Sequence, residues 1–184
     1  MTLLMGLGII QIILKKVIKM NITGIVTEDF INFYKPSMFI STSKCSFKCD
    51  KECGEKICQN SSLAAAPIFK IDDAKIINKY LSNDITEAIV FGGLEPFDTF
   101  DELYDFIWKF RQLSSDTIVI YTGYYPSEIA EQLKKLFKFK NIIIKFGRFI
   151  PNDKTRHDQV LGITLSSSNQ FAQTIEEIRR QMEG

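Results

Sequence analysis

Hydrophobic positions fall into two alternating patterns along most of the chain. Continuous apolar runs of five or six residues are typical of strands buried on both faces of a sheet. These runs are Ser37–Thr42, Glu87–Phe91, Thr117–Tyr121 and Asn141–Phe146. Apolar residues that recur at intervals of three and four predict amphipathic helices between the strands. These helices are Asp72–Leu81, Thr99–Leu113 and Pro126–Phe137, and shorter elements are expected at Asn21–Thr27 (strand), Gln159–Leu165 (strand) and Phe171–Met182 (helix).

This order of elements predicts an α/β protein with a single domain. Apolar strands that alternate with helices form a mainly parallel sheet, covered on both faces or closed into a partial, incomplete TIM-like barrel. The short chain favours the partial barrel. In both arrangements the chemistry lies at the carboxyl ends of the strands. We therefore expect one active face, made of residues 44–58, 92–96, 122–124 and 147–149.

Composition and charge narrow the possible functions. The chain has 184 residues, 45% of them hydrophobic, which is enough for one folded core. Its formal net charge is +1 and it has no long basic stretch, so DNA is not an expected partner. The apolar run Leu3–Leu14 is too short to span a membrane. Residues 1–19 are expected to be an added amphipathic helix or, as we favour, an extension from a misassigned start, with the domain at 20–184.

All four cysteines lie in one short loop that follows a predicted strand. They are Cys45, Cys49, Cys53 and Cys58. A disulfide framework would spread its cysteines along a small secreted chain, and this chain is large enough to fold without one. Thiolates bind iron–sulfur clusters and zinc, so the loop predicts a metal site in the reducing cytoplasm. Such close spacing makes a four-thiolate zinc site cramped, whereas a cluster held by three cysteines keeps one iron open for substrate.

The pattern Cys45-x3-Cys49, with Cys58 two residues before an asparagine, resembles the cluster loop of radical S-adenosylmethionine enzymes. It is most similar to the activating protein of anaerobic ribonucleotide reductase, an activase of glycyl-radical enzymes. That family uses the spacing Cys-x3-Cys-x2-Cys, and this chain lacks a cysteine at the third position. The third ligand is then either Cys53, which keeps the loop close to the usual length, or Cys58, which keeps the trailing asparagine and implies an insertion. We favour Cys58.

Three further segments match the same family by their order. Gly92-Gly93-Leu94-Glu95-Pro96 resembles the Gly-Gly-Glu-Pro element that binds the amino group of S-adenosylmethionine, with Leu94 inserted. The alternative interpretation is a plain turn. The resemblance implies that Thr122 contacts the ligand, and the alternative is that Thr122 only ends a strand. It also implies that Asn169 orients cofactor or substrate, and the alternative is a turn that caps the final helix. The resemblance covers roughly residues 36–171.

The function implied by the resemblance is that of a radical S-adenosylmethionine oxidoreductase. A 4Fe–4S cluster would reduce S-adenosylmethionine to methionine and a 5′-deoxyadenosyl radical, which would generate a glycyl radical on a partner such as anaerobic ribonucleotide reductase. An electron donor such as flavodoxin or ferredoxin is also implied. Neither DNA nor a membrane is an expected partner. Two alternatives remain: a radical enzyme acting on a small molecule or nucleotide, and a non-catalytic zinc- or cluster-binding interaction module with no affinity for S-adenosylmethionine.

Overall fold

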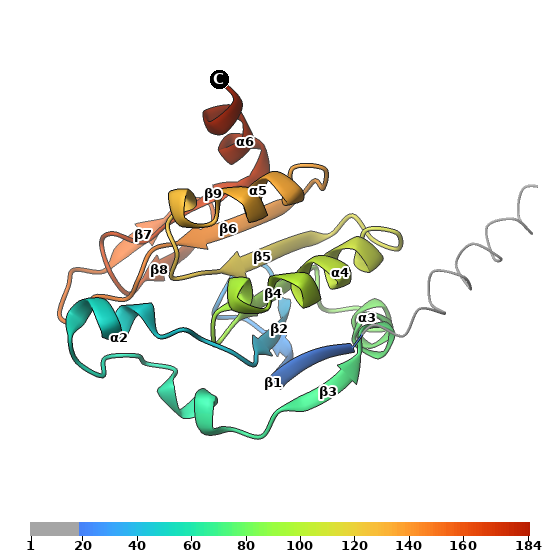
Figure 1. Ribbon diagram of the computed structural model, residues 1–184. Coiled ribbons are helices and arrows are strands. Elements are labelled where there is room, and N and C mark those ends of the chain that lie inside the picture. Colours follow the sequence, from blue (N-terminus) through green and yellow to red (C-terminus); the bar gives the residue numbers. More distant parts are fainter. Residues whose placement is uncertain (1–18) are drawn as a thin grey trace, which may run out of the picture.

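The computed structural model describes residues 19–184, which build an open seven-stranded sheet (Figure 1). The expected extension at residues 1–19 lies outside the described residues, apart from Lys19 at the start of the first strand. The strands occur in the order β3-β1-β2-β4-β5-β6-β9. They are β1 (Lys19–Asp29), β2 (Ser37–Thr42), β3 (Phe69–Asp72), β4 (Ala88–Gly92), β5 (Thr117–Tyr121), β6 (Ile142–Phe146) and β9 (Phe171–Thr174). Two short strands, β7 (Arg156–Asp158) and β8 (Ile163–Leu165), pair with each other.

The centre of the sheet is parallel, as the alternation of strands and helices predicts. Strands β2, β4, β5 and β6 run in the same direction, and Val90 of β4 lies between Phe39 of β2 and Val119 of β5. Strands β1, β3 and β9 are antiparallel to their neighbours. The α/β class is therefore confirmed, but the sheet is mixed. A TIM-like barrel is not confirmed, because the sheet does not close and β3 and β9 lie at its two edges.

The larger apolar core lies between one face of the sheet and the helices α3 to α6. The described α-helices are α2 (Lys48–Cys53), α3 (Asp73–Leu81), α4 (Phe100–Phe110), α5 (Ala130–Leu136) and α6 (Ile175–Glu183). Side chains alternate along a strand, so Ile89 and Phe91 face this core while Ala88 and Val90 face the other side. The second, smaller core is covered by Phe33 and by residues 160–165. Helices α3 to α6 thus cover one face, and loop residues together with strand β8 cover the other.

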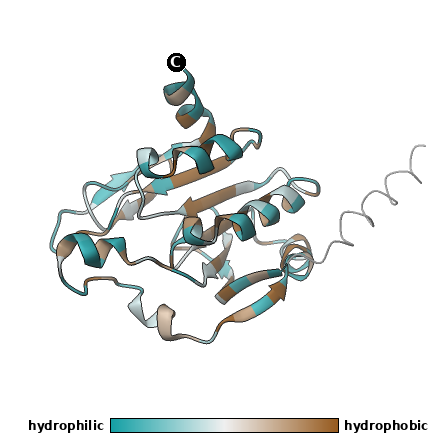
Figure 2. Ribbon diagram, viewed as in Figure 1, coloured by the Kyte–Doolittle hydropathy of each residue, from teal (hydrophilic) through white to brown (hydrophobic). Residues whose placement is uncertain are grey.

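Helix α4 shows how the sequence pattern produces this packing. Leu103, Phe106, Ile107 and Phe110 recur at threes and fours, and each is fully buried. Burial of an aliphatic or aromatic side chain of this size stabilises the fold by about 1.5–3 kcal/mol. Figure 2 shows the apolar residues concentrated on the central strands and the polar residues on the outer side of the helices. Among the described helices, none has the length and hydrophobicity that a membrane span requires.

The structure corrects several expected elements. The predicted helix Phe171–Met182 starts with β9, which pairs with β6, and the helix itself begins at Ile175. Thr174 and Glu177 form a capping box at that point, which sets the start of α6. The expected strand Gln159–Leu165 is reduced to β8. Strand β3 and helix α2 were not predicted.

Candidate functional site at the cysteine loop

Three of the four cysteines face one pocket at the carboxyl ends of the parallel strands. Cys45, Cys49 and Cys58 line it, together with the residues that follow β4, β5 and β6. Cys53 is exposed at the end of α2 and does not line the pocket. The structure thus brings together three of the four candidate ligands, and Cys58 rather than Cys53 joins the first pair.

The path of the loop explains this placement. Phe47 adopts a left-handed conformation, with φ of 52°, immediately before α2, and Gly54 ends the helix with φ of 76°. The Asp50 carboxylate then accepts hydrogen bonds from the backbone N–H groups of Ile57 and Cys58, at 3.0 and 2.9 Å. These bonds fold the segment after α2 back on the helix, and Cys58 therefore faces the pocket.

Helix α2 is held by charged groups, because none of its residues Lys48–Cys53 is buried. Lys48 donates to Glu128 at 2.9 Å, Arg148 donates to Glu128 at 2.6 Å, and Arg148 also pairs with Glu52 at 3.0 Å. The Arg148 hydrogen bond in particular lowers the pKa of Glu128 to about 2. We call Lys48, Glu52, Glu128 and Arg148 the charge clamp.

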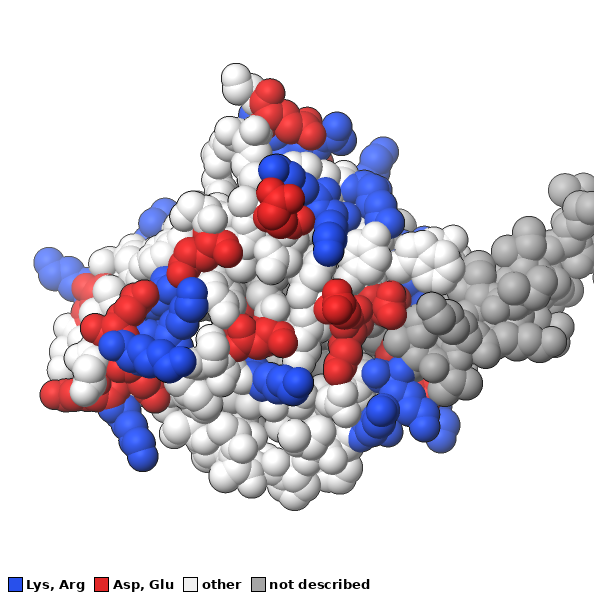
Figure 3. Space-filling model, in the orientation of Figure 1, with Lys and Arg blue, Asp and Glu red and all other residues white. Residues whose placement is uncertain are grey.

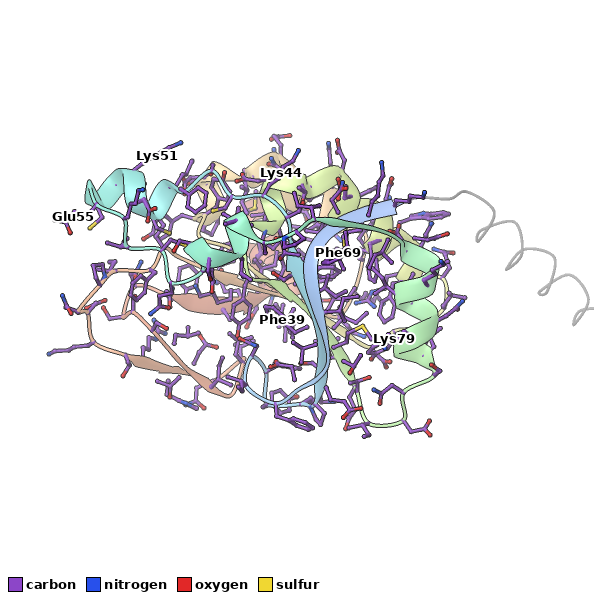
Figure 4. The ribbon with its side chains drawn as sticks, turned by 90° about the horizontal axis from the view of Figure 1, so that it is seen from below. Phe39, Lys44, Lys51, Glu55, Phe69 and Lys79 are labelled. Carbon is purple, nitrogen blue, oxygen red and sulfur yellow. The ribbon has the colours of Figure 1, made fainter. Side chains whose placement is uncertain are left out.

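The outer side of α2 is free of such contacts. Lys51 and Glu55 project away from the body of the protein (Figure 4). Acidic and basic side chains are interleaved over this region of the surface, at the left of the view (Figure 3). The helix is therefore attached along the side that carries Cys49 and solvated along the other.

Hydrogen bonds join the cysteine loop to the ends of β4 and β5. The Glu95 N–H donates to the carbonyl oxygen of Lys44 at 2.8 Å, and the Ser46 N–H donates to the Asp98 carboxylate. The Tyr124 hydroxyl donates to the same carboxylate at 2.6 Å. The start of the loop is thus fixed relative to the segments that the sequence placed on the active face.

Glu95 and Thr122, two candidate ligand-binding residues, are in direct contact. The Glu95 carboxylate accepts from the Thr122 hydroxyl at 2.7 Å, from the Gly123 N–H at 2.8 Å and from the Phe97 N–H at 3.1 Å. Glu95 is only 7% exposed, and burial raises its pKa to about 7 although these hydrogen bonds act in the opposite direction. Glu95 therefore joins the ends of β4 and β5 and carries an acidic group in the pocket wall.

The glycine pair after β4 has a steric role. Gly93 lines the pocket with φ of 75°, and a Cβ at this position would overlap the Ser41 hydroxyl. Only glycine tolerates both the conformation and the contact. Leu94, the inserted residue, also lines the pocket, whereas Gly92 and Pro96 are buried beside it.

Asn169 does not line the pocket. Its side-chain amide donates to the Tyr125 hydroxyl at 2.9 Å and to the carbonyl oxygen of Arg148 at 3.0 Å. The neighbouring Gln170 does line the pocket and donates to the carbonyl oxygen of Gly147 at 3.3 Å. The Asn169 contacts thus support the loop after β6, one layer behind the pocket.

Lys145 is a pocket residue to which the sequence pattern assigned no role. It lies in β6 between Ile144 and Phe146, lines the pocket and is only 7% exposed. Its ammonium group donates to the carbonyl oxygen of Gly147 at 3.0 Å, and burial lowers its pKa to about 8. In the sequence, Lys145 is a charged residue within a run of isoleucine and phenylalanine, and it begins the segment Lys145–Phe149, which resembles the C-terminal part of the same activases.

The thiols are in a partly desolvated environment. Burial raises the pKa of Cys45 to about 12, and it also raises the pKa of Cys58. Neutral thiols are therefore favoured in the metal-free site, and a metal that binds them must displace protons.

The donor set is chemically suited to an iron–sulfur cluster. Among residues 19–184, no group of three or more His, Cys, Asp or Glu side chains is close enough together to hold one metal ion. Three soft thiol ligands around a shared pocket suit a multi-iron cluster, whose irons lie apart and keep their ligands apart. Cys45, Cys49 and Cys58 are the residues that would hold it.

A family model described as a 4Fe-4S single cluster domain matches residues 35–172. The chain belongs to this family. The matched range extends from just before β2 through the cysteine loop and the parallel strands into β9, so it includes the lining residues of the pocket except Ile31 and Asn32. No match was found among curated proteins or among solved structures. The chain is therefore a 4Fe–4S cluster-binding domain.

Proposed function

We propose that Cys45, Cys49 and Cys58 bind one 4Fe–4S cluster and leave one of its irons without a protein ligand. The observation that carries this proposal is that these three cysteines line one pocket while Cys53 is exposed outside it. A fourth thiolate would close the cluster and suit simple electron transfer. An open iron instead suits a cluster that binds a substrate.

We further propose that this substrate is S-adenosylmethionine. When bound, the reduced cluster supplies the electron that cleaves the sulfonium into methionine and a 5′-deoxyadenosyl radical. The chain's own residues would orient the ligand: the Gly93 backbone lines the pocket, and the Glu95 carboxylate offers an acceptor for an ammonium group. Thr122 fixes the orientation of that carboxylate. The resemblance of the Gly92–Pro96 turn to the family element supports this assignment.

The proposed target of the radical is a glycine residue of a partner protein, as in glycyl-radical activases. The pocket opens beside the loop between β1 and β2, where Phe30 and Ile31 are 65% and 77% exposed and Ile31 lines the pocket itself. An apolar rim of this kind suits contact with another protein chain. A flavodoxin or ferredoxin is the proposed electron donor.

The decisive experiment uses anaerobically reconstituted protein. Iron and sulfide are determined, the protein is reduced with dithionite, and 5′-deoxyadenosine is measured after S-adenosylmethionine is added. Production of 5′-deoxyadenosine by a protein with a full 4Fe–4S complement supports the proposal. Zinc in place of iron, or a cluster that leaves S-adenosylmethionine intact with and without a partner, would refute it.

The assignment of the third ligand has its own test. Cys58→Ser should lose the bound iron and the absorbance of the cluster, because it removes a ligand that faces the pocket. Cys53→Ser is the matched control in the same loop and should keep wild-type iron and sulfide content. The opposite result would make Cys53 the ligand and would require the segment after α2 to refold around the metal.

A further inference from the structure

The charges around the pocket are unbalanced. Among the described residues that line it, Lys145 is the one lysine or arginine. The potential anions are the Glu95 carboxylate and three cysteine thiolates that metal binding would generate. A cluster held by three thiolates therefore places several negative charges around one cation.

Lys145 also differs from the other buried cations of the described chain. Lys109 is 1% exposed and lies 3.5 Å from Asp73, and the Arg148 side chain is 5% exposed and pairs with two carboxylates. Lys145 is 7% exposed, yet no described carboxylate lies within ion-pair distance of its ammonium group. Its single hydrogen-bond acceptor is a neutral carbonyl oxygen. A buried ammonium without an ion-pair partner is costly. The Glu95 carboxylate acts on it only from beyond ion-pair distance, so we expect Lys145 to face an anion that binds in the pocket.

We propose that Lys145 is the countercharge of the cluster and stabilises its reduced state. One-electron reduction adds a negative charge to a site already rich in thiolate, and a fixed cation in the wall of the pocket favours that form. Charge and hydrogen bonding around a cluster are known determinants of its reduction potential. This inference rests on the cluster site of the proposed function, and it does not depend on cleavage of S-adenosylmethionine.

The sign and size of the effect follow from electrostatics. Removal of the positive charge makes reduction harder, so the midpoint potential becomes more negative. As an order of magnitude, a unit charge at about 10 Å in a medium of effective permittivity about 20 changes a one-electron reduction equilibrium by roughly tenfold. For a one-electron couple a tenfold change corresponds to about 59 mV.

The experiment is a dithionite redox titration of the reconstituted protein at fixed pH, followed by electron paramagnetic resonance. Lys145→Met and Lys145→Gln remove the charge, and Lys145→Arg keeps it. Lys140→Met is the matched control: Lys140 is an exposed lysine that precedes β6 at its amino end, whereas Lys145 lies near the carboxyl end of the strand and lines the pocket. We expect the equilibrium constant for reduction of the cluster to fall about tenfold in Lys145→Met and Lys145→Gln. Lys145→Arg and Lys140→Met should keep the wild-type midpoint potential.

Several outcomes would overturn the inference. A wild-type midpoint potential in the neutral variants would overturn it. If these variants also bound S-adenosylmethionine more weakly, the charge of Lys145 would act on that ligand and not on the cluster. An equal loss in Lys145→Arg would show that packing and not charge is responsible. If both neutral variants lose the cluster, its retention in Lys145→Arg supports the countercharge and its loss there opposes it.

The same titration separates this inference from the proposed function. A wild-type protein without iron would refute the cluster site and the countercharge together. A wild-type cluster that leaves S-adenosylmethionine intact would refute the radical chemistry alone, since the potentials of the variants can still be compared.

Discussion

The charge clamp leads to a quantitative prediction about Glu128. Glu128→Ala removes the acceptor that Lys48 and Arg148 share and leaves the 5%-exposed Arg148 side chain with Glu52 alone. The Glu128 side chain is 25% exposed, and solvent screening keeps its pair with the exposed Lys48 below about 1 kcal/mol. The shorter bond from the buried Arg148 contributes about 1.5–3 kcal/mol. We expect α2 to lose about 2–3 kcal/mol of local stability.

Hydrogen exchange of α2 measures this loss. The amide of Lys51 donates to Phe47 and the amide of Gly54 donates to Asp50, and both report on opening of the helix. A loss of about 2–3 kcal/mol corresponds to exchange that is roughly 30- to 150-fold faster. The cluster should also be lost faster to an iron chelator, because α2 carries Cys49. Global unfolding in urea should change little, since α2 buries no residue.

The control and the refuting result are equally specific. Glu131→Ala removes an exposed carboxylate that pairs with Lys134 on the same helix, α5, and it should leave α2 exchange unchanged. If Glu128→Ala behaves like this control in both exchange and iron loss, the charge clamp does not hold the loop. The pKa of Glu128, about 2, adds a pH criterion. The stabilisation that ionised Glu128 contributes is fully present above its ordinary pKa of 4.5 and is lost only as the pH falls through about 2. The strength of the charge clamp should therefore be constant from pH 6 to 8.

Two further predictions concern stability. Gly93→Ala should destabilise the protein by about 1–3 kcal/mol in urea unfolding, because φ is 75° and the new Cβ meets Ser41, whereas Gly24→Ala meets no atom within 4 Å and should be neutral. Lys109→Met should cost about 3–5 kcal/mol at pH 8, since it leaves Asp73 buried without its cation, and the added change Asp73→Leu should recover most of it. Burial raises the pKa of Asp73 to about 7. The stabilisation from its protonated form is therefore complete below the ordinary pKa of 3.8 and is lost as the pH rises through 7. Asp73→Asn should reduce the resulting pH dependence of the unfolding free energy.

Each of these stability predictions has an outcome that contradicts it. Equal unfolding midpoints for Gly93→Ala and the wild type would mean that the turn adjusts at no cost. A Lys109→Met protein whose double variant is no more stable would show that lost packing, rather than an uncompensated carboxylate, causes the effect. Unfolding free energies of Asp73→Asn that keep the wild-type slope between pH 5 and pH 8 would exclude Asp73 as its source.

The central sheet was predictable because its strands are buried. Thr117–Tyr121 is a continuous apolar run, and β5 has the same bounds. The edge strands carry no comparable signal. Strand β3 has only four residues, none of them buried, and depends on its pairing with β1. Strand β9 precedes a helix directly, and its residues were assigned to that helix because no glycine or proline separates them.

The candidate site shows the same division between local and long-range information. The order of strands predicted which segments meet, and Cys45, Cys49, Glu95 and Thr122 do lie around one pocket or in contact with it. Whether Cys58 faces that pocket depends on hydrogen bonds from the loop backbone to Asp50, and no spacing rule contains them. The charge clamp was missed for a similar reason, because its members are distant in sequence and each alone is an ordinary charged residue.

The cysteine loop has a consequence for how the protein matures. Residues 44–68 contribute no side chain to either of the described apolar cores, which are formed by the strands, by α3 to α6 and by the loops behind the sheet. The loop can therefore remain open while the rest of the chain folds. Small zinc domains differ, since they need their metal to fold at all. We therefore expect the scaffold of this protein to fold before iron and sulfide are delivered, and to stay folded when the cluster is removed.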